Sequence, residues 1–444
     1  MKKNILVFPC GSEVALEMHR SVTNSTHFRL VGGSSVEDHG RFVYENYVGE
    51  LPFLGSSDFV ACIRKVVERE KIDAIYPAMD AVITFMKGHE GELGCRVVGS
   101  PAETSEVCVS KRRTYRALAG VVKTPRTYGE GERPNVAEYP VFAKPDVGYG
   151  SRGARKISCA EELDVHLAAH PGCVLMECLP GEEYTVDCFT DAEGHLRVAK
   201  PRTRSRISNG ISVHTEPVED NGEFLDFAKR INAALRFEGA WFFQVKRDGA
   251  GALTLLEVAC RLGGSSGLWR PCGLNFALMT LYTAFHMPIA ILENRIHPIM
   301  DRALDIRYKL DFSYDEVFVD FDDCLSLDGR RVNPVLAAFL YDCLGRGIRT
   351  TLLTKHDDEM LGPLENLLDR LRIRPLFDRV LHIGKTEEKA DYIDNRNAIF
   401  IDDSFAERRK VAEHFGMPVF GVDIVETLWR DGKKQRISKG CCVR

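Results

Sequence analysis

Residues 139–157 read YPVFAKPDVGYGSRGARKI, a short apolar run followed by a loop rich in glycine. The run ends in Lys144, and glycines stand at positions 148, 150 and 153. Glycine leaves backbone N–H groups uncovered and tolerates positive φ, so such a loop can wrap closely around a polyphosphate, with Lys144 as a point charge beside it. An ordinary surface hairpin can have the same composition. The features on either side must therefore distinguish the two interpretations.

The composition is that of a soluble protein with several domains. The chain has 444 residues, of which 44% are apolar and 28% charged. A net charge of −5 argues against a general nucleic-acid binder. No window approaches the roughly eighteen uncharged apolar residues of a membrane span, so we expect no membrane association. Fourteen cysteines without a C-x-x-C pair or a zinc-ligand spacing indicate reduced thiols and a cytoplasmic protein.

The first hundred residues alternate strand-like and helix-like runs. Strands are predicted at 3–8, 28–31, 73–76 and 96–98, and a helix at 58–70. This alternation predicts a parallel sheet with helices on its faces. Ligands bind such sheets beyond the carboxyl ends of the strands.

Three charged residues follow the predicted strand ends. Glu13 and Arg20 are explained better as ordinary helix charges than as substrate contacts. Asp80 comes directly after the strand at 73–76 and is a candidate for binding a substrate, with a helix N-cap as its alternative role.

The middle of the chain combines helices with strand pairs. Ser110 is a predicted N-cap for a helix that starts at Lys111. Residues 174–187 read as strand, turn and strand, and the alternation of Tyr184, Val186 and Cys188 is typical of a half-buried strand. An amphipathic helix is predicted at 223–236. A hairpin of strands at 240–246 and 252–258 follows, and its second strand runs into the motif E-x-x-x-R-x-G-G at 257–264.

This order of features resembles the ATP-grasp superfamily, in the branch of carbamoyl-phosphate-synthase-like carboxylate–amine ligases. The features are Lys111, Lys144 with its glycine loop, Glu177 to Glu183, Gln244 and the 257–264 motif. The resemblance implies an α/β multidomain chain. A pre-ATP-grasp Rossmann-like domain would span 1–110, and an ATP-grasp domain of two α+β subdomains would span 111–295, with its lid at about 124–185.

The resemblance implies ATP and Mg²⁺ as cofactors. Adenine needs an apolar slot with a backbone edge, which the segment from Met176 to Leu179 offers, and Glu177 would accept a hydrogen bond from its exocyclic amine. Glu183 would hold the ribose hydroxyls, and the two lysines would neutralise phosphate oxygens. The residues expected to bind the nucleotide are Lys111, Lys144, Gly148, Gly150, Ser151, Arg152, Gly153, Glu177, Leu179 and Glu183.

Mg²⁺ prefers hard oxygen ligands and uses few protein groups when it bridges phosphates. Glu257 is the stronger candidate ligand and Gln244, on the adjacent strand, the weaker one. Arg261, a planar cation with several donors, suits the transferring phosphoryl group. A surface ion pair is the alternative for Glu257 and Arg261. Similar enzymes usually carry Asn two residues after the metal-binding Glu, where this chain has Ala259.

Three alternate arginines, Arg202, Arg204 and Arg206, follow a further lysine. On one face of a strand they would suit a substrate that carries a phosphate or an extra carboxylate, and we take Arg204 and Arg206 as candidate substrate-binding residues. A solvated charge run and contacts to ATP are equally good explanations.

After a connector at 296–314, a new apolar strand delivers Asp320 and Asp322 at its carboxyl end. Closely spaced carboxylates are costly without a cation. A second strand ends in Thr354, Lys389 opens a predicted helix, and a third strand ends in Asp402 and Asp403. These four elements resemble the haloacid-dehalogenase (HAD) phosphatase superfamily. The resemblance implies a HAD-like Rossmannoid domain at 315–444, without a large cap because the connections are short.

The resemblance also implies the role of each residue. Asp320 would be the nucleophile that forms an aspartyl-phosphate, and Asp322 would protonate the leaving oxygen and later activate water. Thr354 and Lys389 would hold phosphoryl oxygens, with Lys385 as the reserve lysine. The expected metal ligands are Asp320, Asp322, Asp402 and Asp403. A degenerate domain kept for packing is the alternative.

The sequence thus predicts an enzyme with two activities. The first 300 residues would activate a carboxylate with ATP, pass it to an amine and release ADP, and the tail would remove a phosphate from a phosphorylated substrate. A carboxylate kinase without an amine acceptor and an ATP-binding module with a vestigial phosphatase are the rival interpretations. Neither a nucleic-acid partner nor a membrane is expected, and the oligomeric state is left open.

Overall fold

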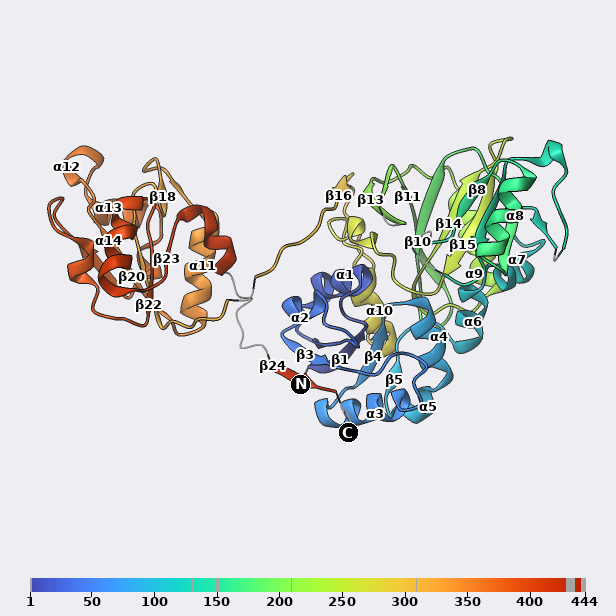
Figure 1. Cartoon of the computed structure of the whole chain (residues 1–444), viewed down its shortest axis with the longest axis horizontal. Helices are drawn as coiled ribbons and strands as arrows, with labels where there is room; N and C mark the ends of the chain where they lie inside the picture. The colour runs from blue at the N-terminus through green and yellow to red at the C-terminus, as the bar shows by residue number, and fades with distance from the viewer. Residues whose placement is uncertain are drawn as a thin grey trace. The chain divides into compact units, whose positions relative to one another are not determined.

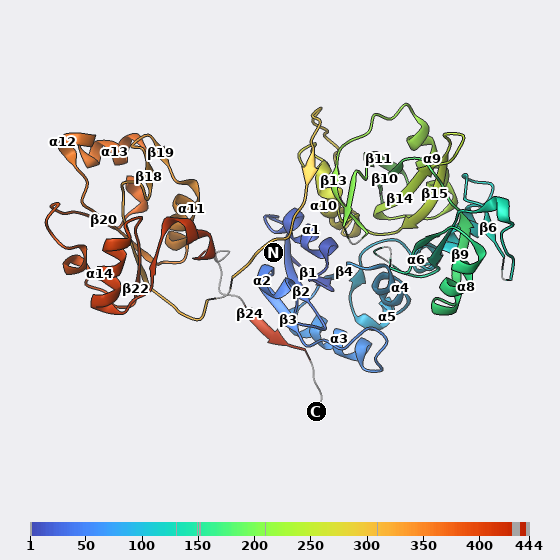
Figure 2. The same ribbon diagram turned by 45° about the horizontal axis from the view of Figure 1, so that its top comes forward.

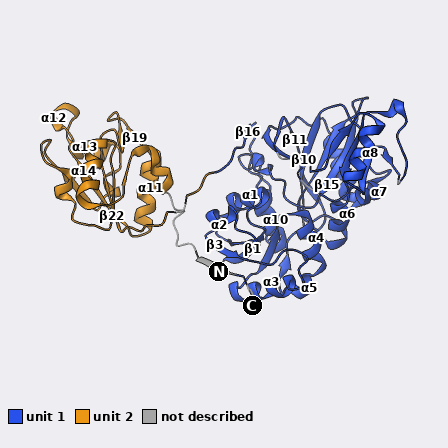
Figure 3. Ribbon diagram, viewed as in Figure 1, with its two compact units in different colours: residues 1–305, 436–444 blue, residues 306–435 orange. Residues whose placement is uncertain are grey.

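The computed structural model describes residues 2–129, 131–148, 150, 152–208, 210–308, 310–428 and 436–440, with backbone alone at 436–439. The chain forms two compact units, residues 1–305 with 436–444 and residues 306–435 (Figure 1 and Figure 3). Among the described residues, no helix has the length and apolar character needed to cross a bilayer.

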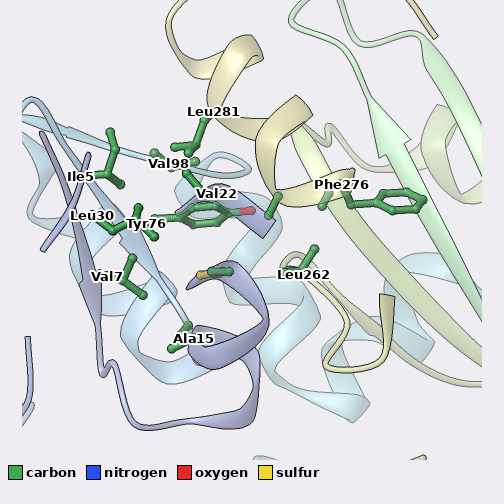
Figure 4. Close-up of a cluster of buried hydrophobic side chains, with 14 of the residues drawn as sticks. Ile5, Val7, Ala15, Val22, Leu30, Tyr76, Val98, Leu262, Phe276 and Leu281 are labelled. Atoms are coloured by element: carbon green, nitrogen blue, oxygen red, sulfur yellow. The ribbon is translucent and has the colours of Figure 1, made fainter. Parts of the chain in front are cut away.

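The first unit begins with a parallel sheet of strand order β24-β3-β2-β1-β4-β5. Residues alternate along β1, so that Ile5 and Val7 pack with the cluster of α1 and α10 (Figure 4), while Leu6 and Phe8 pack with α3. Both faces are covered, as the sequence predicts. The elements are β1 (Lys3–Phe8), α1 (Glu13–Val22), β2 (Phe28–Gly33), α2 (Gly40–Val43), β3 (Asn46–Gly49), α3 (Phe59–Glu70), β4 (Ala74–Pro77), α4 (Asp80–Gly88), α5 (Glu90–Leu93), β5 (Arg96–Val97), α10 (Phe276–Ala284) and β24 (Arg436–Lys439).

A second, antiparallel sheet has the order β11-β10-β14-β15. Its elements are β10 (Glu183–Thr190), β11 (Leu196–Thr203), β14 (Gly239–Arg247) and β15 (Leu253–Ala259), and α9 (Glu223–Ala234) packs on it through Phe224, Phe227 and Ile231. The prediction of a half-buried strand at 184–188 is wrong. Strand β10 is an inner strand and is buried from Tyr184 to Thr190, because α9 covers one face and other parts of the unit cover the other.

A third sheet, β6-β9-β7-β8, holds the glycine loop. Its elements are β6 (Thr127–Tyr128), β7 (Val141–Pro145), β8 (Arg155–Ile157) and β9 (Cys173–Glu177), with α8 (Ala160–Ala169) packed on it (Figure 2). Helices α6 (Ala102–Val109) and α7 (Lys111–Leu118) precede it, and a small sheet joins β12 (Arg206–Ser208), β13 (Ile211–Thr215) and β16 (Met300–Asp301). The third sheet ends at Glu177, whereas the lid was predicted to continue to about 185.

The second unit is a parallel sheet of order β21-β20-β17-β22-β23. Alternation along β17 again serves two faces: Val317 and Val319 pack with α11 and α13, and Phe318 packs with α14. The elements are β17 (Glu316–Val319), β18 (Ser326–Leu327), β19 (Arg331–Val332), α11 (Pro334–Gly345), β20 (Arg349–Thr354), α12 (Asp358–Leu361), α13 (Leu364–Arg370), β21 (Arg379–His382), the 3-10 turn η4 (Lys389–Tyr392), β22 (Ala398–Ile401), α14 (Phe405–Phe415) and β23 (Val419–Phe420). This unit ends at residue 435, because β24 pairs with β3 in the first unit.

Candidate active sites

Lys144 lies near the end of β7 and is almost completely buried. Its Nζ donates a 2.8 Å hydrogen bond to the carbonyl of Leu256 in β15 and lies 5.4 Å from the centre of the Tyr115 ring. Burial lowers the pKa of Lys144 to about 8, although the negative charge of Glu257 opposes this shift. Burial of the Lys144 ammonium group costs solvation free energy, and a carbonyl compensates for only part of this cost. The buried cation is therefore well placed to bind an anion.

Glu257 and Gln244 face each other across β15 and β14, as predicted. Thr185 of β10 lies opposite Gln244 on its other side. Both predicted metal ligands are half-buried, and the two residues offer hard oxygen atoms from neighbouring strands. Because Mg²⁺ bound to phosphates needs few protein ligands, this pair fits a magnesium site even with Ala259 in place of a further oxygen ligand.

Arg204 joins this group from the end of β11. Its Nε forms a 2.6 Å ion pair with Glu183, and its two Nη atoms donate to the hydroxyl of Thr185 and the carbonyl of Gly210. Burial lowers the pKa of Arg204, while the nearby carboxylates of Glu183 and Glu257 oppose the shift. The structure therefore brings Lys144, Glu257, Glu183 and Arg204 into one electrostatic cluster.

The glycine loop approaches this cluster from the third sheet. Lys111 donates a 3.1 Å hydrogen bond to the carbonyl of Gly148, and the backbone of Gly150 packs against Gly210. A Cβ atom at Gly210 would lie 2.4 Å from the carbonyl carbon of Gly150, so the close approach requires glycine there. Ser151 lies outside the described residues, and its neighbours Arg152 and Gly153 are exposed and half-buried, respectively.

The predicted adenine segment follows β9. Glu177 ends that strand, and its Oε1 accepts a 2.8 Å hydrogen bond from the backbone N–H of Arg126. Leu179 is buried, and Glu183 opens β10. The side chain of Glu177 is thus engaged locally, and its contact with a base stays a prediction.

Asp80 and Arg261 bind each other, with 2.9 Å between the Asp80 carboxylate and Arg261 Nε. Asp80 is the first residue of α4, and Met79 occupies the N-cap position, so the alternative role of Asp80 as an N-cap is wrong. Arg261 also lies over the ring of Phe242, 5.2 Å from its centre. This ion pair joins the start of α4 to the segment that follows β15, the strand that carries Glu257.

The three alternate arginines do not share a face, contrary to the prediction. Strand β11 ends at Thr203, so the alternation is broken after Arg202. Arg202 is buried in an ion pair with Asp187, and the exposed Arg206 pairs with Asp301 across the small sheet. Arg204 alone joins the cluster around Glu257, which removes the basis for a triple-arginine phosphate site.

The second unit gathers its predicted residues at the carboxyl ends of β17 and β22. Lys389, only 3% exposed, donates from Nζ to Asp320 at 2.6 Å and to Asp402 at 2.7 Å. Thr354 ends the neighbouring strand β20 and is buried as well. The reserve lysine, Lys385, is exposed and pairs instead with Asp357.

Asp320, Asp402 and Asp403 offer carboxylate oxygens that all lie within 4.8 Å of one another. Burial raises the pKa of Asp320 to about 7 and also raises the pKa of Asp402, while Lys389 opposes both shifts. One ammonium group does not neutralise the charge of three carboxylates, and a hard divalent cation fits this set of oxygen donors. Asp322 is not part of this cluster, so its role as a metal ligand stays a prediction.

The carboxylate of Asp322 is bound by His356, whose Nδ1 lies 2.8 and 3.0 Å from its two oxygens. Burial lowers the pKa of His356, but hydrogen bonds to the carbonyl of Gly362 and to Asp322 outweigh it, so that the pKa lies above its ordinary value. Sequence reasoning missed His356 because its proximity depends on the fold. It also missed Tyr115 and Thr185, although the alternation from Glu183 could have found Thr185.

Comparison with known proteins supports the fold of the first unit. A family model described as ATP-grasp in the biosynthetic pathway with Ter operon matches residues 169–306. The D-alanine–D-alanine ligase of Thermotoga maritima is 27% identical over 165 residues, which cover 33% of this chain and 54% of the ligase. The chain therefore spans about half the length of this curated relative.

Two similar solved structures extend this comparison. One is the biotin carboxylase domain dimer of the 2-oxoglutarate carboxylase from Hydrogenobacter thermophilus in complex with MgADP, ADP and bicarbonate, with TM-score 0.54 and 16% identity over 66% of this chain and 71% of that chain. The other is the L-amino acid ligase from Bacillus licheniformis, with TM-score 0.52 and 17% identity over 64% of this chain and 74% of that chain. These likenesses show that the chain contains a mixed α/β ATP-grasp fold.

Proposed function

We propose that the first unit is an ATP-dependent, ADP-forming ligase that joins a carboxylate to an amine through an acyl phosphate. The observation that carries this proposal is the convergence of Lys144, Glu257, Glu183 and Arg204 from neighbouring sheets, beside a glycine loop. The likeness to a D-alanine–D-alanine ligase and an L-amino acid ligase supports the reaction class, and the complex of a similar domain with MgADP supports the nucleotide.

In the first step, a carboxylate oxygen of the substrate attacks the γ-phosphorus of ATP, and the bond to the bridging oxygen breaks to release ADP. Lys144 and Lys111 neutralise phosphate oxygens, and Arg261 stabilises the phosphoryl group in transfer. In the second step, the amine nitrogen attacks the acyl carbon, phosphate leaves, and the nitrogen loses a proton. The glycine loop excludes water, which protects the acyl phosphate from hydrolysis.

Glu257 and Gln244 would hold Mg²⁺, which supplies charge neutralisation between the phosphates. Fewer protein oxygens would contact a second ion, because Ala259 stands where similar enzymes usually have Asn. The cysteines in the described part of the chain form no disulfide bond, which supports a reducing compartment such as the cytoplasm.

The reaction class can be tested by measuring ADP release from the full-length chain with pools of carboxylates and amines, followed by mass spectrometry of the products. We expect ADP release that needs both substrates and an amide product of matching mass. ADP release with carboxylate alone would favour the kinase interpretation. ATP binding without turnover across broad pools would favour a binding module.

The buried ammonium group of Lys144 gives a prediction about stability. Its pKa is lowered, so the folded state binds its proton less tightly than the unfolded state, and the penalty is full below pH 8 and disappears as the pH rises towards 10.5. Lys144→Met should therefore raise the free energy of unfolding at pH 7 by about 1–3 kcal/mol. The carbonyl of Leu256 keeps its second donor, the hydroxyl of Tyr115.

Urea unfolding of Lys144→Met and the unaltered chain at pH 7 and pH 9.5 checks this prediction. The difference in stability should shrink at the higher pH, and stabilisation by ATP with Mg²⁺ should be lost in the variant. A variant that is less stable than the unaltered chain at pH 7 would contradict the account of Lys144 as a buried charge kept for anion binding.

For residues 306–435 we propose a second activity, the hydrolysis of a phosphate monoester by a HAD-type mechanism. The cluster of Asp320, Asp402, Asp403 and Lys389 at the carboxyl ends of parallel strands supports it. Asp320 would attack phosphorus while the ester oxygen leaves with a proton from Asp322. Water then attacks the aspartyl-phosphate, gives its proton back to Asp322, and frees Asp320 and phosphate.

Asp402 and Asp403 would hold Mg²⁺ together with Asp320, and Thr354 and Lys389 would bind phosphoryl oxygens. Phosphate release from p-nitrophenyl phosphate and from a panel of alkyl phosphates tests this activity in the full-length chain, with EDTA as the metal-free control. Loss of turnover in EDTA and recovery with Mg²⁺ are expected.

A further inference from the structure

His356 is buried and yet polar, and every hydrogen-bonding group of its ring has a partner. The side chain has 0% exposure. Its Nε2 lies 2.8 Å from the carbonyl of Gly362, and its Nδ1 faces the carboxylate of Asp322. A carbonyl oxygen can only accept, so Nε2 donates to Gly362. The ring is therefore fixed at both edges.

Further contacts fix the backbone and the plane of His356. The ring of His382 donates from Nε2 to the carbonyl of His356 at 2.8 Å, and the ring of Phe321 meets the imidazole edge-on at 5.5 Å between centres. His356 also comes two residues after Thr354, so one segment delivers both side chains to the site. A buried, fully bonded residue of this kind orients its partner more rigidly than an exposed one can.

The contacts of His356 fix the orientation of the Asp322 side chain. Asp322 follows β17 in the loop from Phe321 to Cys324, and its side chain is 32% exposed, so one side remains open for a substrate. The neighbouring Asp323 has a positive φ of 55°. In the described part of the chain, His356 is the only residue that forms a hydrogen bond with the carboxylate of Asp322.

A hollow of about 460 Å³ is lined by His356, His382 and the acidic segment 357–359 among others. The hollow thus adjoins the residue that binds Asp322, whereas Asp322 itself is not part of its lining.

We propose that His356 is a positioning residue that holds Asp322 in the orientation needed to protonate the leaving oxygen. This inference rests on the proposed phosphatase activity. A mispositioned acid matters most when the leaving oxygen is strongly basic, as in an alkyl phosphate. It matters little for the first step with p-nitrophenyl phosphate, because p-nitrophenolate leaves without a proton.

The two amide side chains give a matched pair of variants for the test. In His356→Asn, the amide nitrogen lies near the position of Nδ1 and can still donate to Asp322. In His356→Gln, it reaches the position of Nε2 and keeps the bond to Gly362 but loses Asp322. Both variants bury one amide in place of the ring, so they share the general cost of the change. The exposed His414→Gln is the control in the same unit.

In the full-length chain we expect His356→Gln to lower kcat for alkyl phosphates by about 30-fold or more, with KM nearly unchanged. The first-turnover burst of p-nitrophenol should stay within about threefold of the unaltered chain, and His356→Asn should keep alkyl phosphate turnover within about threefold. In a chain that carries Asp322→Asn, adding His356→Gln should lower turnover no further.

The positioning role would be overturned if His356→Asn and His356→Gln lost alkyl phosphate turnover equally. It would also be overturned if His356→Gln lost alkyl phosphate turnover and the p-nitrophenol burst equally. Thermal unfolding confirms that each variant is folded. If His356→Gln prevents folding, the His356→Asn variant alone tests the positioning role. Retained turnover of alkyl phosphates in this variant would support the role, and loss of turnover in a folded protein would contradict it. An unaltered chain that hydrolyses no phosphate ester would instead overturn the phosphatase proposal, and this role with it.

Discussion

Glu257→Ala is expected to lower ADP release by about 10³-fold, equivalent to about 4 kcal/mol of transition-state stabilisation. Two effects of the change act in the same direction. The first is the loss of the strongest candidate ligand for Mg²⁺, which Gln244 alone cannot replace. The second is the loss of a negative charge beside two buried cations, since Glu257 raises the pKa values of both Lys144 and Arg204.

The second effect can be separated from the first. Glu257→Gln keeps the shape and one oxygen but removes the charge, so the pKa of Lys144 should fall further below its present value of about 8. ADP release should then be low near neutral pH and depend on pH more steeply than in the unaltered chain. Initial rates of ADP release between pH 6 and pH 9, at saturating and at limiting Mg²⁺, measure both effects.

Glu68→Ala is the matched control, because Glu68 is an exposed residue of α3 that pairs only with Arg64 in the described structure. It should leave ADP release unchanged. Hydrolysis of p-nitrophenyl phosphate should be unaffected by either substitution, since the proposed second site lies in a different unit. A parallel loss of both activities in Glu257→Ala would contradict the division into two sites.

The sequence predicted most of the elements that carry chemistry, because strand ends and glycine loops leave local signals. Alternation and turn residues predict the strand before Lys144 and the pairing of Gln244 with Glu257. They also predict the aspartates that follow β17 and β22. Whether the three arginines lie on the same face of one strand could not be predicted in this way. Strand β11 ends at Thr203, and Arg202 and Arg206 found partners, Asp187 and Asp301, that are distant in sequence.

Contacts between distant segments also explain the other failures. Nothing local marks His356 as the partner of Asp322, because 34 residues separate them. The burial of β10 depends on which helices cover its sheet, and the return of β24 to β3 depends on pairing across nearly the whole chain. Periodicity identifies an element, whereas tertiary packing decides what the element contacts.

Asp320→Asn is expected to abolish phosphate ester hydrolysis, with a loss of at least about 10⁴-fold, and to leave ADP release unchanged. An amide oxygen is a poor nucleophile, so no aspartyl-phosphate can form. Phosphate release from alkyl phosphates and ADP release in the same preparation measure the two activities. Asp328→Asn, an exposed acid between β18 and β19 that pairs with Arg331, is the control.

The loss in Asp320→Asn should not come from unfolding, and the pH dependence of stability shows why. Because burial raises the pKa of Asp320 from 3.8 to about 7, the folded state binds its proton more tightly than the unfolded state does. The metal-free chain should therefore lose stability as the pH rises from about 4 to about 7, and the neutral amide removes this loss. With Asn, the charges of positions 320, 402 and 389 sum to zero instead of −1, so Lys389 still has Asp402 as its partner. In EDTA at pH 8 the variant should be at least as stable as the unaltered chain, whereas added Mg²⁺ should stabilise the unaltered chain more, because only that chain keeps all three carboxylates.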